Sequence, residues 1–316
     1  MENEKKTFEY FTSSAKEWVE KAYKGDKGHY PTAKHRNRIV INEISKLTEK
    51  KLKILDVGCG GGNLGIKLGK KGHSVIGLDQ SQNMIDIAKE KMKGEDIDVT
   101  FIRSKFGQIN DILTDRQFDI IIAMGFIGYL DNDSTFFIGI KNFLVKGGLL
   151  FLSCRNRMFN MNPTSLYFKN ELNGSNTVKL VDELNEQIMK TNIDFSDVKK
   201  FISSLKHHLE VIESNLDAWY LDDKNNNSRS SKEYFIPPVI ARQHTPHQLS
   251  TIAKKYNFKE ISLYGFHPHI MQPLVGKILS LRVFNEISNA LCVFESDPIS
   301  LTWCSGFIAK FLKEGD

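Results

Sequence analysis

Continuous apolar runs alternate with amphipathic stretches along residues 51–157. The runs lack the in–out alternation of a half-exposed strand, which indicates strands covered on both faces. In the stretches between them, apolar residues recur at helical spacing, as in residues 84–92. The pattern predicts helices separated by strands at 53–57, 73–78, 99–103, 118–124 and 149–154. This alternation predicts an α/β fold with an open, doubly wound sheet.

Residues that favour helix ends mark the boundaries of these helices. Asn63 is expected to cap the helix after the first strand, and Gly72 is expected to stop it. Ser81 is expected to cap the helix after the second strand. Asp131 or Asp133 is expected to cap the helix that follows the fourth strand.

The alternation breaks after residue 157. Residues 177–190 and 195–212 have helical apolar spacing, whereas the stretch DDKNNNSRSSK has no apolar side chain and predicts a loop. The α/β pattern resumes at Thr245-Pro246, a helix start with a cap and a first-turn proline.

Two further strands are expected near the end of the sequence. They lie at 258–264 and 305–312, and an insertion that is partly helical around 276–294 separates them. The whole pattern divides the chain into an N-terminal helical lid, an α/β core, a helical cap and a C-terminal completion of the core sheet, at 1–50, 51–157, 158–240 and 241–316.

Composition and charge are those of an ordinary globular protein. Of 316 residues, 41% are hydrophobic, and the net charge of +5 comes from dispersed lysines, which argues against a dedicated nucleic-acid surface. The N-terminus, MENEKKTFEYF, lacks the apolar centre of a signal peptide, and the longest apolar run, IIIAMGFIGYL, is shorter than the ~20 residues a membrane span needs. We therefore expect a cytoplasmic protein, with Cys59, Cys154, Cys292 and Cys304 as free buried thiols.

The turn after the first strand is rich in glycine and preceded by an acid. Glycines stand at 58, 60, 61 and 62, and the first of them comes two residues after Asp56. A dinucleotide-binding G-x-G-x-x-G turn would place its third glycine at Asn63 and a pyrophosphate close to Asp56. A carboxylate repels a pyrophosphate but pairs with an ammonium group, so the turn favours a cationic ligand without phosphates. Asp79, at the end of the second strand, can accept two hydrogen bonds from the hydroxyls of a ribose.

Four stretches, in order, resemble the class I S-adenosylmethionine-dependent methyltransferases of the small-molecule type. They are ILDVGCGGG, VIGLDQSQNMIDIA, FDIIIAMGFIGYL and FLVKGGLLFLSC, and they cover about a third of the chain. HTPHQLSTIAKKYNFKEISLYGF is similar to that family's entry into its sixth strand. The resemblance implies a Rossmann-like sheet of seven strands with the last one antiparallel, and a helical cap insertion. It implies S-adenosyl-L-methionine as the cofactor.

The resemblance also implies which residues contact that cofactor. They are Asp56, Gly58, Cys59 and Gly60 in the first motif, Asp79, Gln80 and Met84 in the second, and Met124 and Gly125 after the fourth strand. The family's acid after the third strand is replaced here by Ser104 or Lys105, so adenine recognition falls to Ser104, Phe106 or the main chain. FEYFTSSAKEWVEKAY is similar to the family's N-terminal lid helix, with Tyr10, Phe11 and Trp18 over the cofactor; an amphipathic helix packed on the sheet is the alternative.

Methyl transfer to oxygen or nitrogen requires a group that removes a proton, and histidine has a pKa suited to that task. His244 precedes a helix, and His267 and His269 follow the sixth of the seven expected strands. These three are the candidate catalytic residues, with a capping or surface role as the alternative for each. Arg155 and Arg157 are candidates to bind an anionic group of the acceptor.

Metal and nucleic-acid chemistry are not expected. Asp131-Asn132-Asp133 offers hard oxygen ligands, but a helix cap explains the pattern without a metal, and His267-Pro268-His269 has no acidic or cysteine partner nearby. The Asn/Asp-Pro-Pro-aromatic motif of base methyltransferases is replaced by Ala123-Met124-Gly125-Phe126. We expect methylation of a small-molecule hydroxyl oxygen. The alternatives are N-methylation of a metabolite amine, a catalytically silent methyltransferase-like binding protein and, further back, a dinucleotide-dependent oxidoreductase. The oligomeric state stays open.

Overall fold

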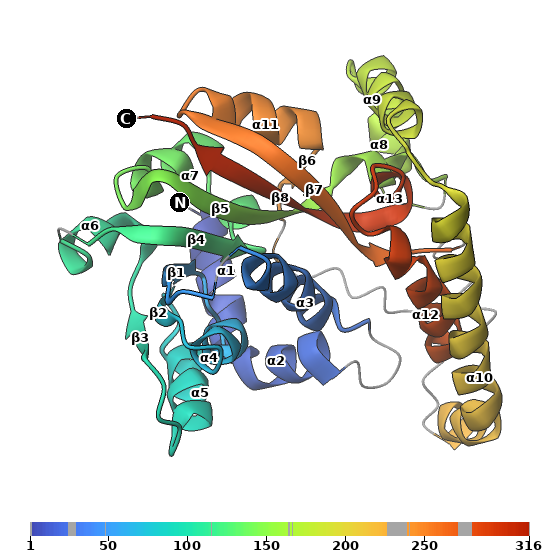
Figure 1. Cartoon of the computed structure of the whole chain (residues 1–316), viewed down its shortest axis with the longest axis horizontal. Helices are drawn as coiled ribbons and strands as arrows, with labels where there is room; N and C mark the ends of the chain where they lie inside the picture. The colour runs from blue at the N-terminus through green and yellow to red at the C-terminus, as the bar shows by residue number, and fades with distance from the viewer. Residues whose placement is uncertain are drawn as a thin grey trace.

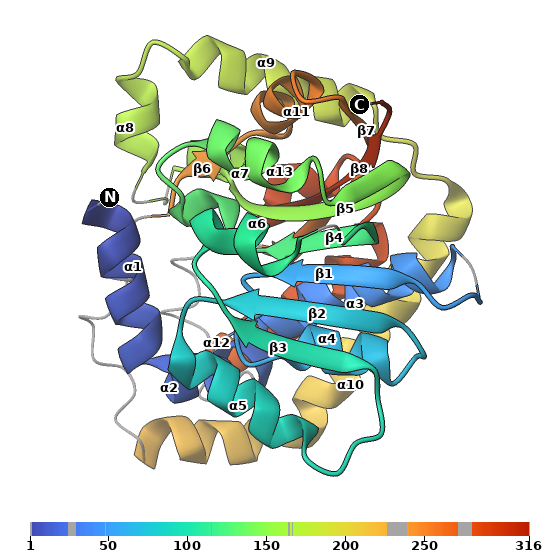
Figure 2. The ribbon, with the colours of Figure 1, turned by 90° about the vertical axis from the view of Figure 1, so that its left-hand side faces the viewer.

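A central sheet with helices on both faces forms the body of the protein (Figure 1). The computed structural model describes residues 2–24, 30–47, 49–114, 116–163, 165, 167–225, 239, 241–270 and 280–315. Figure 2 looks across the strands, with α6 and α7 in front of the sheet and α3 and α4 behind it. The predicted doubly wound α/β fold is confirmed.

Seven strands follow one another across the sheet in the order β3-β2-β1-β4-β5-β8-β7. The strands are β1 (Lys53–Val57), β2 (Ser74–Asp79), β3 (Val99–Arg103), β4 (Phe118–Met124), β5 (Leu144–Asn156), β7 (Phe258–Pro268) and β8 (Cys304–Lys313). Strands β1 to β5 pair in parallel, whereas β8 is antiparallel to both β5 and β7. The seven-stranded path with an antiparallel last strand is confirmed, and β6 (Gln243–His244) pairs with β5 as a short eighth strand.

Each face of the sheet is covered by its own set of helices. One face packs against α3 (Thr32–Ser45), α4 (Asn63–Gly69) and α5 (Gln82–Met92), with Ile39, Leu68 and Ile85 in the shared core. The other packs against α6 (Ile109–Ile112), α7 (Asp133–Ile140) and α11 (Pro246–Lys254), with Phe136, Phe137 and Leu249 fully buried. Burial on both faces explains the continuous apolar runs of β1 and β4.

The remaining helices lie around this body. They are α1 (Glu2–Ser13), α2 (Ala15–Lys24), α8 (Phe168–Leu172), α9 (Thr177–Met189), α10 (Phe195–Asn225), α12 (Leu281–Asn289) and α13 (Ser300–Trp303), with 3-10 turns η2 (Phe106–Gln108), η3 (Ile127–Tyr129), η4 (Arg157–Met161) and η6 (Ala290–Phe294). The helix predicted at 195–212 continues to Asn225, so the predicted loop DDKNNNSRSSK begins inside α10 and its remainder lies outside the described residues. Figure 1 shows α10 at one flank of the molecule beside α12. None of the described helices combines the length and apolar character needed to cross a bilayer.

Two of the predicted helix caps are right and two are wrong. Ser81 accepts a hydrogen bond from the Met84 amide, and Thr245 forms a capping box with Gln248. At α4 the cap position is Gly62, in a left-handed conformation with φ 72°, and Asn63 is already helical. At α7 the cap is Asn132, which accepts from the Thr135 amide, because ion pairs occupy the Asp133 carboxylate.

All four cysteines are free thiols, as predicted. Cys59, Cys154 and Cys304 are buried, whereas Cys292 in η6 is only half-buried. The expectation of four buried thiols is therefore wrong at one position.

Candidate active site

The glycine turn between β1 and α4 is held close to the end of β2. The Gly58 and Cys59 amides both donate to the Leu78 carbonyl, at 2.8 and 2.9 Å. Gly58 and Gly60 have φ of 71° and 51°, a region that side chains disfavour. A Cβ on Gly58 would lie 2.6 Å from the Phe126 ring. The turn therefore needs glycine both for its conformation and for the room above it.

Asp79 ends β2 beside this turn. Its Oδ2 accepts a hydrogen bond from the Gly60 amide at 3.0 Å, and its Oδ1 accepts from the Ser81 amide at 2.9 Å. Burial raises the pKa of the Asp79 carboxyl, against the lowering effect of these two amides. Each carboxylate oxygen has a second lone pair, so Asp79 can still accept bonds from two ligand hydroxyls.

Asp56, at the end of β1, is an acid with an unpaired oxygen. It is 2% exposed, and Oδ2 has no hydrogen-bond partner within the described part of the chain. Burial raises the pKa of its carboxyl to about 7, helped by the negative charge of Asp79 and opposed by Arg36. A buried carboxylate oxygen without a donor costs free energy, which a cationic ligand group would recover. The residues around the turn thus fit a ligand that carries an ammonium group and a ribose.

Arg36, on α3, is a site residue that sequence reasoning missed. Its guanidinium donates to Ser153 Oγ at 3.5 Å and lies 5.6 Å from the centre of the Phe266 ring. A Cβ on Gly125 would lie 2.5 Å from Arg36 Nη1, so this glycine leaves room for the guanidinium. Burial lowers the pKa of Arg36, and the nearby Tyr23, Tyr129 and Asp56 oppose that shift. In the sequence, its helical spacing to the buried Ile39 and Val40 was the pattern that could have indicated that Arg36 faces the interior.

The other predicted cofactor residues gather around the same turn. Cys59 and Met84 are buried, and Met84 Sδ would lie 3.9 Å from a Cβ on Gly60. Half-buried Gln80 follows Asp79 directly, and Met124 ends β4 beside Gly125.

Ser104 and Phe106, the candidates for the adenine contact, lie just past β3. The Ser104 hydroxyl donates to the Lys105 carbonyl at 2.9 Å, which leaves its oxygen able to accept a bond. The Phe106 ring lies 5.3 Å from the Phe126 ring, centre to centre, and Phe126 covers Gly58. Both candidates are therefore near the turn.

The N-terminal helices bring aromatic side chains toward the turn from outside. Figure 2 shows α1 on the side to which the arrows of β1 and β2 point. The Trp18 ring would contact a Cβ on Gly60 at 3.9 Å, and Phe11 lies edge-on to both Trp18 and Tyr129, at 5.7 and 5.3 Å. Tyr10 contacts Phe11, which in turn contacts Trp18, so along this chain of contacts Tyr10 is two rings further from the turn than Trp18.

His267 and His269 lie together at the end of β7, with ring centres 4.3 Å apart. His267 Nδ1 is 2.7 Å from Ser305 Oγ, and its ring stacks on Tyr30 at 4.4 Å. Burial lowers the pKa of His267 well below its usual range, and the neighbouring His269, His35 and Arg155 add to this shift. Burial also lowers the pKa of His269 to about 4, and both of its ring nitrogens lack a hydrogen-bond partner among the described residues. Both rings are therefore neutral at physiological pH.

His244 is separated from these two histidines by the sheet. His244 pairs with Asn156 of β5, and successive side chains of a strand point to opposite faces. His244 therefore lies on the face opposite to that of Arg155, whose charge acts on His267. The Nε2 of His244 lies 3.0 Å from both carboxylate oxygens of Asp133, at the start of α7. Burial alone would raise the pKa of the Asp133 carboxyl. Hydrogen bonds from His244 and Arg242 outweigh this effect, so the pKa is lowered. His244 thus belongs, with Arg242, to the polar cluster around Asp133 on the α7 and α11 face.

The two arginines past β5 differ in their surroundings. Arg157 forms hydrogen bonds and an ion pair with Glu171, so its charge is already matched. Arg155 is exposed, and its charge acts on His267 and Tyr129. No ion pair of Arg155 forms with any residue that the structure describes.

Three features point to one class of protein, the methyltransferases whose cofactor contains a nucleoside. They are the order of the sheet, the glycine turn after β1 and the acids at the ends of β1 and β2. Residues 54–148 match the family model described as a methyltransferase domain. Over this segment, which is about a third of the chain, the protein is similar to the class I S-adenosylmethionine-dependent methyltransferases.

Relatives in two bacteria and one solved structure are similar to the chain. It is 25% identical over 188 residues to a ubiquinone biosynthesis O-methyltransferase of Rickettsia canadensis, covering 57% of this chain and 76% of that protein. It is 31% identical over 136 residues to the protein of the same name in Coxiella burnetii, covering 41% and 57%. The fold matches magnesium protoporphyrin IX methyltransferase from Synechocystis, solved with S-adenosylhomocysteine, with a TM-score of 0.52 and 14% identity over 98% of this chain and 99% of the other.

Proposed function

We propose that the protein transfers a methyl group from S-adenosyl-L-methionine to a hydroxyl oxygen of a small molecule that carries an anionic group. The observation that carries the proposal is the neutral imidazole of His267, whose Nδ1 lies 2.7 Å from Ser305 Oγ and whose surroundings include the charge of Arg155. The names of the relatives, which are O-methyltransferases, support oxygen as the acceptor atom.

The chain's own residues would hold the cofactor from four sides. Asp56 Oδ2 would accept from its ammonium group, Asp79 from its ribose hydroxyls, and Arg36 would pair with its carboxylate. Ser104, Phe106 and Met124 would flank the adenosyl group, and Trp18 would cover the turn. When bound, the cofactor supplies an electrophilic methyl group on a sulfonium.

His267 would act as the general base. If Ser305 accepts from Nδ1–H, Nε2 carries the lone pair that takes the proton of the acceptor hydroxyl. A pKa well below the usual range keeps the ring unprotonated and ready to accept at neutral pH. His269 contacts the same ring and would help to keep water from it.

Arg155 would select the acceptor. An exposed guanidinium without an ion pair among the described residues can form a bidentate pair with a carboxylate or a phosphate. Its position beside Tyr129 and His267 would orient the hydroxyl toward the base. Positioning of this kind can contribute much of the rate of a displacement reaction.

Calorimetric titration with S-adenosylhomocysteine, beside NADH, tests the cofactor part of the proposal. We expect micromolar binding of the former and none of the latter. Absence of S-adenosylhomocysteine binding would overturn the proposed function and favour a catalytically silent protein.

Transfer of radiolabelled methyl to matched acceptors tests the reaction. 3,4-Dihydroxybenzoate, catechol and 3,4-diaminobenzoate share one shape and differ in the anionic group or in the acceptor atom. We expect the dihydroxybenzoate to be methylated faster than catechol, and Arg155→Met to remove that preference. Transfer to the diamine alone would show N-methylation instead.

A further inference from the structure

We propose that His35, Cys292 and Glu295 form a zinc site that joins helix α3 to the segment after α12. One ligand atom of each lies within 4.8 Å of the others. Within the part of the chain that the structure describes, this is the one such group of three His, Cys, Asp or Glu side chains. The site lies outside the glycine turn, so it goes beyond the proposed function.

The spacing of two ligands is already close to that of a bound metal. His35 Nε2 lies 3.0 Å from Glu295 Oε2. Tetrahedral zinc, with bonds of about 2.0–2.2 Å to nitrogen and oxygen, sets that separation at about 3.4 Å. Side-chain rotation of the half-buried Cys292 would complete the set, and a water would take the fourth position.

The donor set selects the kind of metal. Imidazole nitrogen, thiolate sulfur and carboxylate oxygen suit zinc, whereas magnesium and calcium take oxygen ligands almost exclusively. His35 is buried, and Cys292 and Glu295 are partly so, which is the partial enclosure that a three-ligand site with one open position needs.

Tyr30 provides the outer contacts that orient such ligands. Its hydroxyl lies 2.7 Å from His35 Nδ1 and 3.9 Å from Cys292 Sγ. With zinc on Nε2, the ring proton would reside on Nδ1 and be donated to the Tyr30 oxygen, in place of the 3.4 Å contact that Nδ1 accepts from the His267 amide. The Tyr30 hydroxyl would then turn to the thiolate. Contacts of this kind fix the ring orientation in metal sites.

The proton and charge balance of the site is simple. Burial raises the pKa of the Cys292 thiol to about 11, so the empty site holds a neutral thiol, and zinc binding releases that proton to solvent. Without metal, Arg38 balances the Glu295 carboxylate through an ion pair. With zinc, the thiolate and the carboxylate would balance the two positive charges of the ion, Arg38 would keep its contact with the other carboxylate oxygen, and the remaining positive charge would be that of the solvent-exposed Arg38 side chain.

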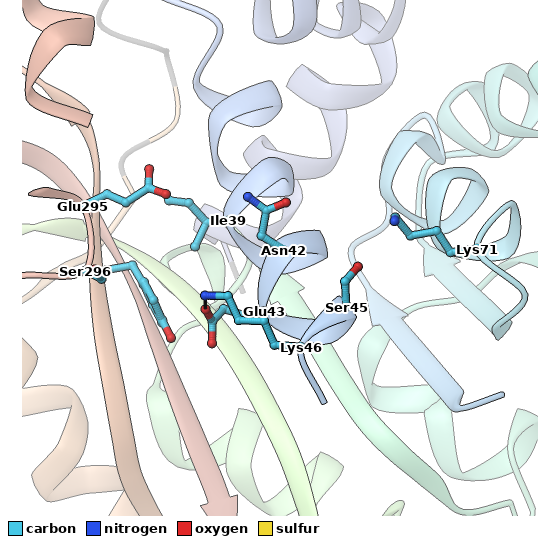
Figure 3. Close-up of a pocket in the computed structure, with 9 residues that line it drawn as sticks. Ile39, Asn42, Glu43, Ser45, Lys46, Lys71, Glu295 and Ser296 are labelled. Carbon is cyan, nitrogen blue, oxygen red and sulfur yellow. Dashed lines mark hydrogen bonds and ion pairs between the residues drawn. The ribbon is translucent and has the colours of Figure 1, made fainter. Parts of the chain in front are cut away.

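A cavity borders the proposed site at Glu295. Figure 3 shows it with Glu295 and Ser296 at one side, and with Asn42 and Glu43 of α3 and the following Lys46 at the other. Its volume is about 410 Å³, which is ample for a hydrated ion. Glu295 therefore faces both the cavity and His35.

Metal analysis of untagged protein, purified from zinc-supplemented cells and passed through gel filtration, tests the site. We expect about one zinc per chain in the unaltered protein, and less than about a tenth of that in Cys292→Ser. Cys154→Ala, which removes a buried thiol on the other face of the sheet, is the matched control and should keep its zinc. Equal zinc in the unaltered protein and in Cys292→Ser would overturn the proposal.

Cobalt substitution provides a second readout that does not depend on activity. Cobalt bound by Cys292 gives a thiolate-to-metal charge-transfer band, which Cys292→Ser should lose while Cys154→Ala keeps it. Absence of the band from the unaltered protein would leave His35, Glu295 and Arg38 as a purely polar contact. S-adenosylhomocysteine affinity, measured on the same samples, should be unchanged in Cys292→Ser, so failure of the zinc site and failure of the proposed function are distinguishable.

Discussion

The two sides of the candidate active site differ in charge. At the ends of β1 and β2 it is acidic, with Asp79 close enough to help raise the pKa of Asp56. At the ends of β5 and β7 it is cationic or neutral, with Arg155 beside His267. Arg36 lies between the two sides, since it interacts with both Asp56 and Ser153. The cationic groups of the cofactor would lie at the acidic ends of β1 and β2, and an anionic acceptor would lie beside Arg155. Arg36 would lie between the two ligands.

His267→Gln is expected to have the largest effect on this arrangement. Glutamine keeps the size of the side chain but cannot take a proton, so turnover should fall by about a hundredfold or more. S-adenosylhomocysteine affinity should stay within about twofold, because the change lies on the acceptor side. Single-turnover methyl transfer and calorimetry together check this.

His244→Gln is the matched variant for that experiment. Because His244 pairs with Asp133 on the other face, it should lower thermal stability and change turnover far less. A larger loss of turnover in His244→Gln than in His267→Gln would move the base to His244.

Arg36→Met tests the residue that joins the two sides. Methionine keeps much of the apolar stem but loses the charge, and we expect S-adenosylhomocysteine to bind about fiftyfold more weakly. Arg38→Met, two residues along the same helix and exposed, serves as the control. An unchanged dissociation constant in Arg36→Met would place the guanidinium on the acceptor side alone.

Asp79→Ala removes the proposed ribose contact. Hydrogen bonds to a charged acceptor contribute about 1.5–3 kcal/mol each, so affinity for S-adenosylhomocysteine should fall at least tenfold. Asp86→Ala, an exposed acid on α5, should leave it unchanged. Equal affinity in calorimetry for both variants would rule out Asp79 as the ribose ligand.

The pKa of Asp56 predicts the smallest effect, a pH dependence of cofactor binding. The ammonium group pairs with the ionised carboxylate, so affinity should be lost as pH falls through about 7. Between about pH 7.5 and 6.0 the ionised fraction drops about eightfold, and the dissociation constant should rise by the same factor. Asp56→Asn should bind more weakly and with a flat profile over this range. A sloped profile in the variant would assign the titration to another group.

The acidic side was accessible from the sequence because it is built locally. Residues 53–84 contain β1, the glycine turn, Asp79 and the Ser81 cap, and their pattern alone predicts a strand, a turn and a helix. The other side contains Arg155 and His267, which the pairing of distant strands brings together, and Arg36 reaches its edge from helix α3. Sequence patterns identified His267 and Arg155 as candidates but gave no sign that Arg36 joins them.

The wrong cap at α7 has the same origin. Asp133 has the chemistry of a helix cap, but Arg242 and His244, more than a hundred residues later, occupy its carboxylate. Asn132 then fills the cap position, one residue from where the pattern pointed. Local propensity decides such a position only when no distant partner takes up the side chain.

The place of β8 has a consequence for how the protein is made. Residues 304–313 pair with β5 on one side and β7 on the other, so the sheet stays open at that gap until this late segment leaves the ribosome. During synthesis the backbone of β5 presents an unpaired edge, which other chains can pair with. Closing the gap requires contacts between residues some 160 positions apart, a slow step by the usual relation between topology and folding rate. Chaperone demand in the cell should therefore concentrate on the interval before β8 inserts.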